Sequence, residues 1–151
     1  MASRRKLRGT ALVVTPKGIL VVKSDGDLYM LPGGQPNREE SRRDAAIREL
    51  KEETGLISAS CTFLFEYTSP YYYHAVYLIT ASGEATPQSE IRYVDYYRGA
   101  NIPLFDSYQK IIQLYKDTLS RDKTRCPYCN AKLETGPSES LICQHCDQIE
   151  T

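Results

Sequence analysis

A group of glutamates inside residues 34–56 constrains this chain more than any other part of its sequence. The acids are Glu49, Glu52 and Glu53, and their spacing places all of them on one side of a helix. Neighbouring like charges destabilise a helix by about 0.2–0.5 kcal/mol per pair, and acids in the last turn also oppose the helix dipole. A solvated acidic face is the ordinary interpretation of such a helix. We favour a metal site, because Mg²⁺ or Mn²⁺ bound by these oxygens would relieve both penalties.

The ends of this helix can also be predicted. Ser41 followed three residues later by Asp44 is typical of an N-cap, and Gly55 is a C-terminal stop. We therefore expect a helix over residues 42–54. The loop before it, residues 31–34, ends in two glycines that can adopt positive φ and bring the backbone close to a ligand or a metal.

The spacing of these residues resembles the complete Nudix box. The matching positions are Gly34, Glu40, Arg48, Glu49, Leu50, Glu52, Glu53, Gly55 and Leu56. All nine specified positions in a stretch of 23 residues match, which makes this a highly specific resemblance. It implies an α/β fold, an α/β/α sandwich around a mixed sheet. It also implies a Mg²⁺- or Mn²⁺-dependent pyrophosphohydrolase that attacks a nucleoside diphosphate linked to another group.

The resemblance further implies roles for individual residues. Metal binding falls to the glutamates Glu49, Glu52 and Glu53, with the Gly34 backbone beside them. Glu49 is the first candidate for the general base that activates water. Arg48 is expected to orient a carboxylate by charge-assisted hydrogen bonds, with an ordinary surface ion pair as the alternative. Glu40 is expected to brace the start of the helix rather than to bind metal.

Two later segments add candidates for the site. MutT-type members commonly take another acidic ligand from a later loop, and residues 89–92 resemble that segment, so Glu90 is a second candidate ligand and base. An ordinary exposed glutamate is the alternative. Pro70 and Tyr71 both satisfy family hints for different substrates, ADP-ribose and dinucleoside polyphosphates, and these hints cancel. Tyr71 and Tyr73 are candidates for stacking on a nucleotide base.

Runs of β-branched and aromatic residues predict the strands of the sheet. They cover residues 10–14, 19–23, 57–67, 72–80 and 92–97, and the first two form a hairpin. Helical spacing of apolar residues predicts a second amphipathic helix over residues 108–119, with Ser107 as its N-cap. Two helices around a mixed sheet agree with the architecture that the resemblance implies.

A small second module follows the second helix. Its cysteines form two CxxC pairs, Cys126 with Cys129 and Cys143 with Cys146, separated by 13 residues. Four thiolates at this spacing can bind Zn²⁺ tetrahedrally, and so short a segment cannot bury a stabilising core without such a staple. We expect a Nudix domain over residues 1–121 and a structural zinc ribbon over residues 122–151. Disulfide bonds are the alternative.

The charge balance bears on partners. Lys plus Arg and Asp plus Glu both number 19, so no overall field attracts nucleic acid or a membrane. The basic run Arg4, Arg5, Lys6 and Arg8 is expected to be a solvated N-terminal tail. The ribbon has five acids and three bases, which disfavours nucleic acid and favours a homodimer, a protein partner or a lid over the substrate.

Hydropathy and the N-terminal sequence predict the compartment. No apolar run approaches the roughly 18–20 residues that span a bilayer, and no signal peptide is visible, so we expect a cytoplasmic protein with reduced cysteines. Cys61 is expected to be a buried strand residue.

Two hypotheses for the function remain: an active nucleotide pyrophosphohydrolase, and a non-catalytic nucleotide sensor or adaptor that recruits a partner through the ribbon. The intact acids favour the enzyme.

Overall fold

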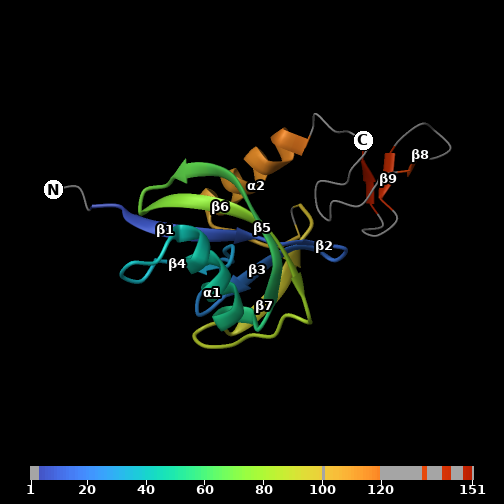
Figure 1. The fold of residues 1–151 in the computed structure, drawn as a ribbon. Coiled ribbons are helices and arrows are strands. Elements are labelled where there is room, and N and C mark those ends of the chain that lie inside the picture. The colour runs from blue at the N-terminus through green and yellow to red at the C-terminus, as the bar shows by residue number, and fades with distance from the viewer. Residues whose placement is uncertain (1–3, 100, 120–133, 136–140, 144–147, 151) are drawn as a thin grey trace.

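A computed structural model describes residues 4–99, 101–119, 134–135, 141–143 and 148–150 of the chain. One sheet comprises β1 (Lys6–Leu12), β4 (Gly33–Gly34), β5 (Ile57–Thr68) and β6 (Tyr72–Ser82), in the spatial order β4-β1-β6-β5. We call it the first sheet. The second sheet comprises β2 (Val14–Thr15), β3 (Gly18–Lys23) and β7 (Tyr93–Tyr97), in the order β2-β3-β7. The two helices are α1 (Arg42–Thr54) and α2 (Asp106–Leu119) (Figure 1).

The first sheet is mixed, as expected. β1 runs parallel to β6 and antiparallel to β4, while β5 and β6 form a long antiparallel pair. In this register Gly9 of β1 lies between Ala75 of β6 and Gly34 of β4. The strand β1 is therefore the central support of the loop that precedes α1.

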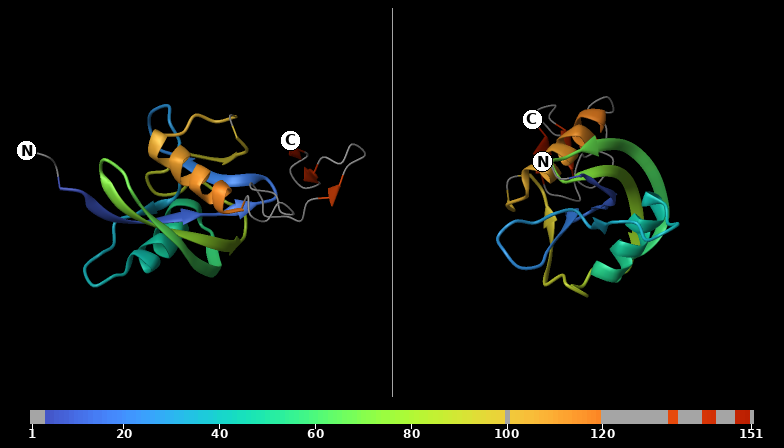
Figure 2. Two further views of the ribbon diagram at one scale, coloured as in Figure 1. Left: turned by 90° about the horizontal axis from the view of Figure 1, so that it is seen from above. Right: turned by 90° about the vertical axis from the view of Figure 1, so that its left-hand side faces the viewer.

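The two helices cover opposite faces of the sheets (Figure 2). Ala11 of β1 belongs to an apolar cluster that includes Ala46 and Leu50 of α1. The next residue, Leu12, belongs to the other cluster, with Ile111 of α2. Successive strand side chains point to opposite faces, so a single strand supplies both cores. The expected mixed α/β arrangement with two helices is confirmed.

The first predicted helix has the predicted bounds. The Ser41 hydroxyl accepts the Asp44 N–H at 3.0 Å, and Gly55 ends the helix with φ of 79°. The second helix begins earlier than expected. Phe105 O accepts the N–H groups of both Tyr108 and Gln109, so the predicted N-cap at Ser107 is wrong and Ser107 lies inside the first turn.

The basic run near the N-terminus is not a solvated tail throughout. β1 begins at Lys6, and Arg8 is only 6% exposed. The Arg8 guanidinium lies over the ring of Tyr72 at 5.5 Å and over that of Tyr108 at 5.6 Å. The prediction fails because it treated a strand residue as part of a charge run, and β-pairing with β6 carries this arginine into the interior.

The C-terminal segment is described only in part. β8 (Glu134–Thr135), β9 (Leu141–Cys143) and β10 (Gln148–Glu150) form a small antiparallel sheet in the order β10-β9-β8. Cys126, Cys129 and Cys146 lie outside the described residues, as does the predicted boundary between residues 121 and 122. Cys61 lies on β5 and is half-buried rather than buried. Within the described part of the chain, neither helix combines the length and apolar character that crossing a bilayer requires.

Gly9 sets the spacing between α1 and the sheet. A Cβ atom at this position would collide with the Arg42 carbonyl oxygen and lie 2.8 Å from the Ala46 nitrogen, both of them α1 backbone atoms. We expect Gly9→Ala to lower the free energy of unfolding by about 1–3 kcal/mol, because the helix must move. Urea unfolding measures this, and Lys6→Ala on the exposed start of the same strand should cost no more than about 0.5 kcal/mol. An unchanged urea midpoint for Gly9→Ala would contradict the close approach.

Candidate metal and active site

The loop before α1 is tied to the helix by a buried carboxylate. The Gly33 N–H donates a 2.9 Å hydrogen bond to Oε1 of Glu53, which is 2% exposed. Gly33 has φ of 151°, whereas Gly34 does not use the positive φ that a glycine can adopt. The glycine pair therefore uses one unusual backbone conformation, and that residue presents its N–H to the buried acid.

Gly34 makes room for a second carboxylate. A Cβ atom at Gly34 would lie 2.5 Å from Cδ of Glu49, so any larger residue would displace that side chain. The predicted proximity of the Gly34 backbone to the acids is therefore present. Its role in the structure is to allow Glu49 to pack against the loop.

The loop between β6 and β7 brings a third carboxylate. The N–H of Thr86 donates to Thr54 O at 2.9 Å, and the N–H of Gln88 donates to Glu53 O at 3.0 Å. Both acceptors are carbonyls of the last turn of α1, which have no partners within the helix. This pairing holds the loop against the helix end. Ser89 follows with φ of 57°, and Glu90 comes directly after it.

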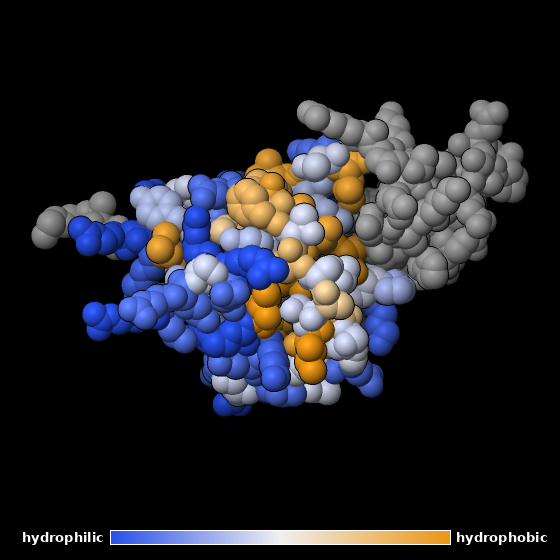
Figure 3. Space-filling view, viewed as in Figure 1, coloured by the Kyte–Doolittle hydropathy of each residue, from blue (hydrophilic) through white to orange (hydrophobic). Residues whose placement is uncertain are grey.

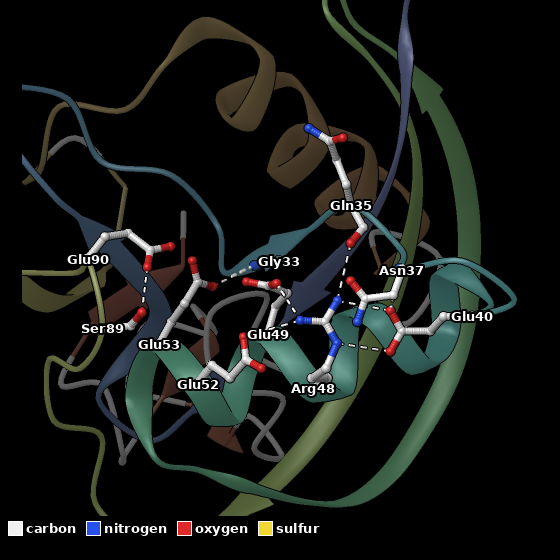
Figure 4. Close-up of polar contacts among 10 residues, drawn as sticks. All are labelled: Gly33, Gln35, Asn37, Glu40, Arg48, Glu49, Glu52, Glu53, Ser89 and Glu90. Atoms are coloured by element: carbon white, nitrogen blue, oxygen red, sulfur yellow. Dashed lines mark hydrogen bonds and ion pairs between the residues drawn. The ribbon is translucent and has the colours of Figure 1, made fainter.

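Three glutamates consequently converge (Figure 4). Glu49, Glu53 and Glu90 each offer a carboxylate oxygen, and these atoms all lie within 4.8 Å of one another. Glu52 is not in this group: its side chain is 51% exposed and it accepts a 3.2 Å hydrogen bond from Arg48. Carboxylate oxygens so close together are the donor set that a hard divalent cation prefers.

Arg48 organises the solvent side of the cluster. Its Nε and Nη2 atoms each donate a 2.9 Å hydrogen bond to Glu40, and its Nη1 donates at 2.7 Å to Oε1 of Glu49. The Arg48 hydrogen bonds, helped by the Asn37 N–H, lower the pKa of Glu40 to about 2, and Glu40 in turn raises the pKa of Arg48. These contacts match the roles expected of Arg48 as an orienting residue and of Glu40 as a brace.

The carboxylates differ in their tendency to ionise. Burial raises the pKa of Glu53 to about 7, although the Gly33 hydrogen bond and the Arg8 charge act in the opposite direction. The Ser89 hydroxyl, which donates to Oε2 of Glu90 at 2.6 Å, lowers the pKa of Glu90. Without a cation, a buried acid thus faces other acids. A divalent ion would compensate this charge.

The predicted tyrosines lie elsewhere. Tyr71 and Tyr73 are 72% and 43% exposed, and the carbonyl of Tyr73 accepts a hydrogen bond from Arg42 at the start of α1. From Arg42 to Glu53 the helix rises about 16 Å. The chain begins at this end of the molecule, where the surface is hydrophilic (Figure 3). The structure does not bring the two rings into the glutamate cluster, and base stacking on them stays a prediction.

Sequence reasoning missed two features of the site. One is the hydrogen bonding of Thr86 and Gln88 to the end of α1, which a sequence does not reveal. The other is Arg8, whose charge acts on Glu53 from the interior. The available signal was that Arg8 lies only two residues before Thr10, where the run that predicts a strand begins.

Comparison with known proteins agrees with this geometry. Residues 5–113 match the NUDIX domain family. A protein from Chromobacterium violaceum described as a nudix hydrolase family member is 37% identical, with a TM-score of 0.73 over 79% of this chain and 81% of that one. No curated protein matches the chain.

Two more distant structures share the fold. An ADP-ribose pyrophosphatase from Streptococcus suis is 23% identical, with a TM-score of 0.62 over 82% of this chain and 96% of that one. The NUDIX domain of Shewanella oneidensis NrtR, complexed with ADP-ribose, is 20% identical, with a TM-score of 0.65 over 78% of this chain and 90% of that one.

The raised pKa of Glu53 makes a prediction for the metal-free protein. Its folded pKa of about 7 exceeds the ordinary value of 4.5, so the folded state retains a proton that the unfolded state releases. The free energy of unfolding should therefore fall as pH rises from about 4.5 to about 7. Glu53→Gln removes this loss. The free energy of unfolding of the variant minus that of wild type should therefore rise by about 2–4 kcal/mol from pH 4 to pH 8.

Urea unfolding in EDTA at the two pH values measures this gain. Glu52→Gln is the matched control, because it removes a half-exposed carboxylate from the same helix and should show a much smaller difference. An equal rise in the free energy of unfolding for the two variants would contradict a raised pKa for the buried Glu53.

Proposed function

Because the chain belongs to the Nudix family of pyrophosphohydrolases, we propose that it hydrolyses a nucleoside diphosphate linked to a second group. The products are a nucleoside monophosphate and the phosphorylated remainder. The observation that carries this proposal is the convergence of Glu49, Glu53 and Glu90, with oxygens within 4.8 Å of one another. A diphosphate repels a water nucleophile, and a cation held by such a cluster is what the reaction requires.

The donor set fits Mg²⁺ or Mn²⁺. All three converging groups are carboxylates, and the buried one has a raised pKa that a cation would oppose. When bound, the ion would neutralise charge on the diphosphate and lower the pKa of a water molecule. Glu49 and Glu53 would hold this ion from the rigid helix, and Glu90 would face its bound water from the loop before β7. Glu52 remains a predicted ligand on the exposed side of α1.

The remaining side chains divide the work of positioning and proton transfer. Arg48 keeps the Glu49 carboxylate in place through its 2.7 Å hydrogen bond. We assign acceptance of the proton from water to Glu90, because it is exposed and carries no ion pair with Arg48, whereas Glu49 does. Glu49 is the alternative base. Metal affinity distinguishes the two candidates, because a variant that loses only the base should still bind the ion, whereas a variant that loses a ligand should bind it more weakly.

Hydrolysis can be tested on a panel of nucleoside triphosphates, ADP-ribose, dinucleoside polyphosphates and nicotinamide dinucleotides with Mg²⁺. Glu49→Gln, Glu53→Gln and Glu90→Gln should each lower kcat/KM by about 10²–10⁴-fold, because each removes a carboxylate from the cluster. Manganese titration should show weaker binding for Glu53→Gln and near-normal binding for Glu90→Gln.

Glu84→Gln provides the control, because Glu84 is exposed in the same connecting segment as Glu90 but lies outside the cluster. Wild-type rates in the cluster variants would refute the site. An absence of turnover across the whole panel, with nucleotide binding intact, would instead favour the sensor.

ADP-ribose is the first substrate to test. Two proteins of the same fold, from S. suis and S. oneidensis, are respectively named for ADP-ribose hydrolysis and complexed with ADP-ribose. The exposed Tyr71 and Tyr73 are proposed to contact a substrate long enough to extend from the cluster to the start of α1. A substrate no larger than a mononucleotide would leave them without a role.

We also propose that residues 122–151 form a zinc ribbon. Two observations support it: the CxxC spacing of the four cysteines, and the small antiparallel sheet whose strand β9 ends at Cys143. Reduced thiols of this kind suit the cytoplasm. The acidic balance of the segment favours a contact with protein, including a second copy of this chain, over nucleic acid.

Zinc analysis tests the ribbon directly. The purified protein should contain one zinc ion per chain, and Cys129→Ser should lose it, because three thiolates bind zinc far more weakly than four. Chelation should speed proteolysis after Arg125 while the larger domain stays folded. Cys61→Ser is the control and should keep its zinc, whereas a metal-free wild-type protein with two disulfide bonds would refute the proposal.

A further inference from the structure

Arg8 is a buried cation with few partners. It is 6% exposed, and its guanidinium lies between the rings of Tyr72 and Tyr108. Its Nη2 donates a 2.9 Å hydrogen bond to the carbonyl of Leu31. Its Nε is buried with no hydrogen-bond partner among the described residues. A guanidinium has five N–H donors, so this one is poorly satisfied.

This environment is unfavourable for stability alone. Removing a charged group from water is costly unless ion pairs and hydrogen bonds replace the lost hydration, and an apolar side chain of similar volume often serves as well or better. The two tyrosine rings supply cation–π attraction, which an apolar chain would partly replace by packing. Stability therefore does not explain why an arginine occupies this position.

The group that Arg8 holds belongs to the active-site loop. Leu31 lies two residues before Gly33, whose N–H is bonded to Glu53. A Cβ atom at Gly33 would lie 3.2 Å from Nη2 of Arg8, so the guanidinium lies directly against this residue. The neighbouring residue on β1, Gly9, pairs with Gly34. Arg8 and Gly9 thus hold the loop from one strand.

We propose that Arg8 is a positioning residue for hydrolysis, holding the Leu31 carbonyl so that the Gly33 N–H and the space at Gly34 meet the carboxylates of Glu53 and Glu49. This inference rests on the proposed function, since it assigns Arg8 to the same reaction. The arginine does not touch the reacting atoms. It acts through the loop, and its contribution is geometric accuracy, where misplacement by about 1 Å can cost up to 10²-fold in rate.

The test uses three variants of the full chain. Arg8→Met keeps an unbranched side chain that can pack between the two rings but donates no hydrogen bond. Arg8→Lys keeps a donor for the Leu31 carbonyl. Arg5→Met is the matched control, because Arg5 also donates to a loop carbonyl, Ser69 O at 2.8 Å, and lies over a tyrosine ring, that of Tyr73, but its carbonyl partner belongs to the loop between β5 and β6 and not to the loop before α1.

We expect Arg8→Met to lower kcat by about ten- to a hundredfold with KM changed by no more than about threefold, because ligand positions rather than substrate contacts are disturbed. Its urea midpoint should stay close to that of wild type, because the cost of burying the guanidinium is removed together with its attraction to Glu53. Amide hydrogen exchange at Gly33, followed by NMR, should become faster. Arg8→Lys should restore most of kcat, and Arg5→Met should keep the wild-type kcat and the wild-type exchange rate at the Gly33 amide.

Wild-type kcat in Arg8→Met would overturn the proposal, as would a loss of kcat that Arg8→Lys does not restore. Unchanged exchange at the Gly33 amide would overturn it independently of turnover. If the wild-type protein hydrolyses nothing in the panel, the proposed function fails, while the exchange measurement still decides whether Arg8 holds the loop.

Discussion

The hydrogen bond from the Gly33 N–H to the Glu53 carboxylate is the contact on which the site depends. It joins the loop before α1 to the last turn of the helix, and it satisfies an acid that is almost fully buried. The loop reaches this position because β4 pairs with β1 at Gly9, where α1 approaches closely enough to exclude a side chain. The geometry of the glutamate cluster is therefore set by backbone packing and not by the acids themselves.

Charge is distributed unequally around the cluster. On the solvent side Arg48 pairs with Glu40, Glu49 and Glu52, so one positive charge partly compensates these three acids without a metal. On the interior side Glu53 has only a neutral N–H donor and the nearby Arg8 charge, and its pKa rises to about 7. The buried side thus retains an unfavourable arrangement that a divalent ion would relieve. Natural sites commonly sacrifice stability in this way where chemistry requires it.

Membership of the Nudix family explains the phosphate chemistry more fully than the choice of substrate. The clustered carboxylates lie on α1 and the loop before β7, whereas the exposed tyrosines lie near the start of α1. Substitutions at the exposed tyrosines can therefore alter that surface without altering the carboxylate cluster. The bounds of α1 and the positions of most strands were predictable because they follow local periodicity and caps. The N-cap of α2 was misplaced by two residues, because the Phe105 carbonyl accepts the first N–H groups of that helix.

The sequence by itself determined the acidic helix, its N-cap at Ser41, its stop at Gly55 and the class of reaction, because these depend on neighbours within a few turns. Tertiary structure alone decided which acids meet. Glu90 joins Glu49 and Glu53 because Thr86 and Gln88 pair with the free carbonyls at the end of α1, while Glu52 turns towards solvent. It also decided that Arg8 is interior, since pairing with β6 gives that residue its burial. Contacts between distant segments follow from chain packing, which spacing along a sequence does not specify.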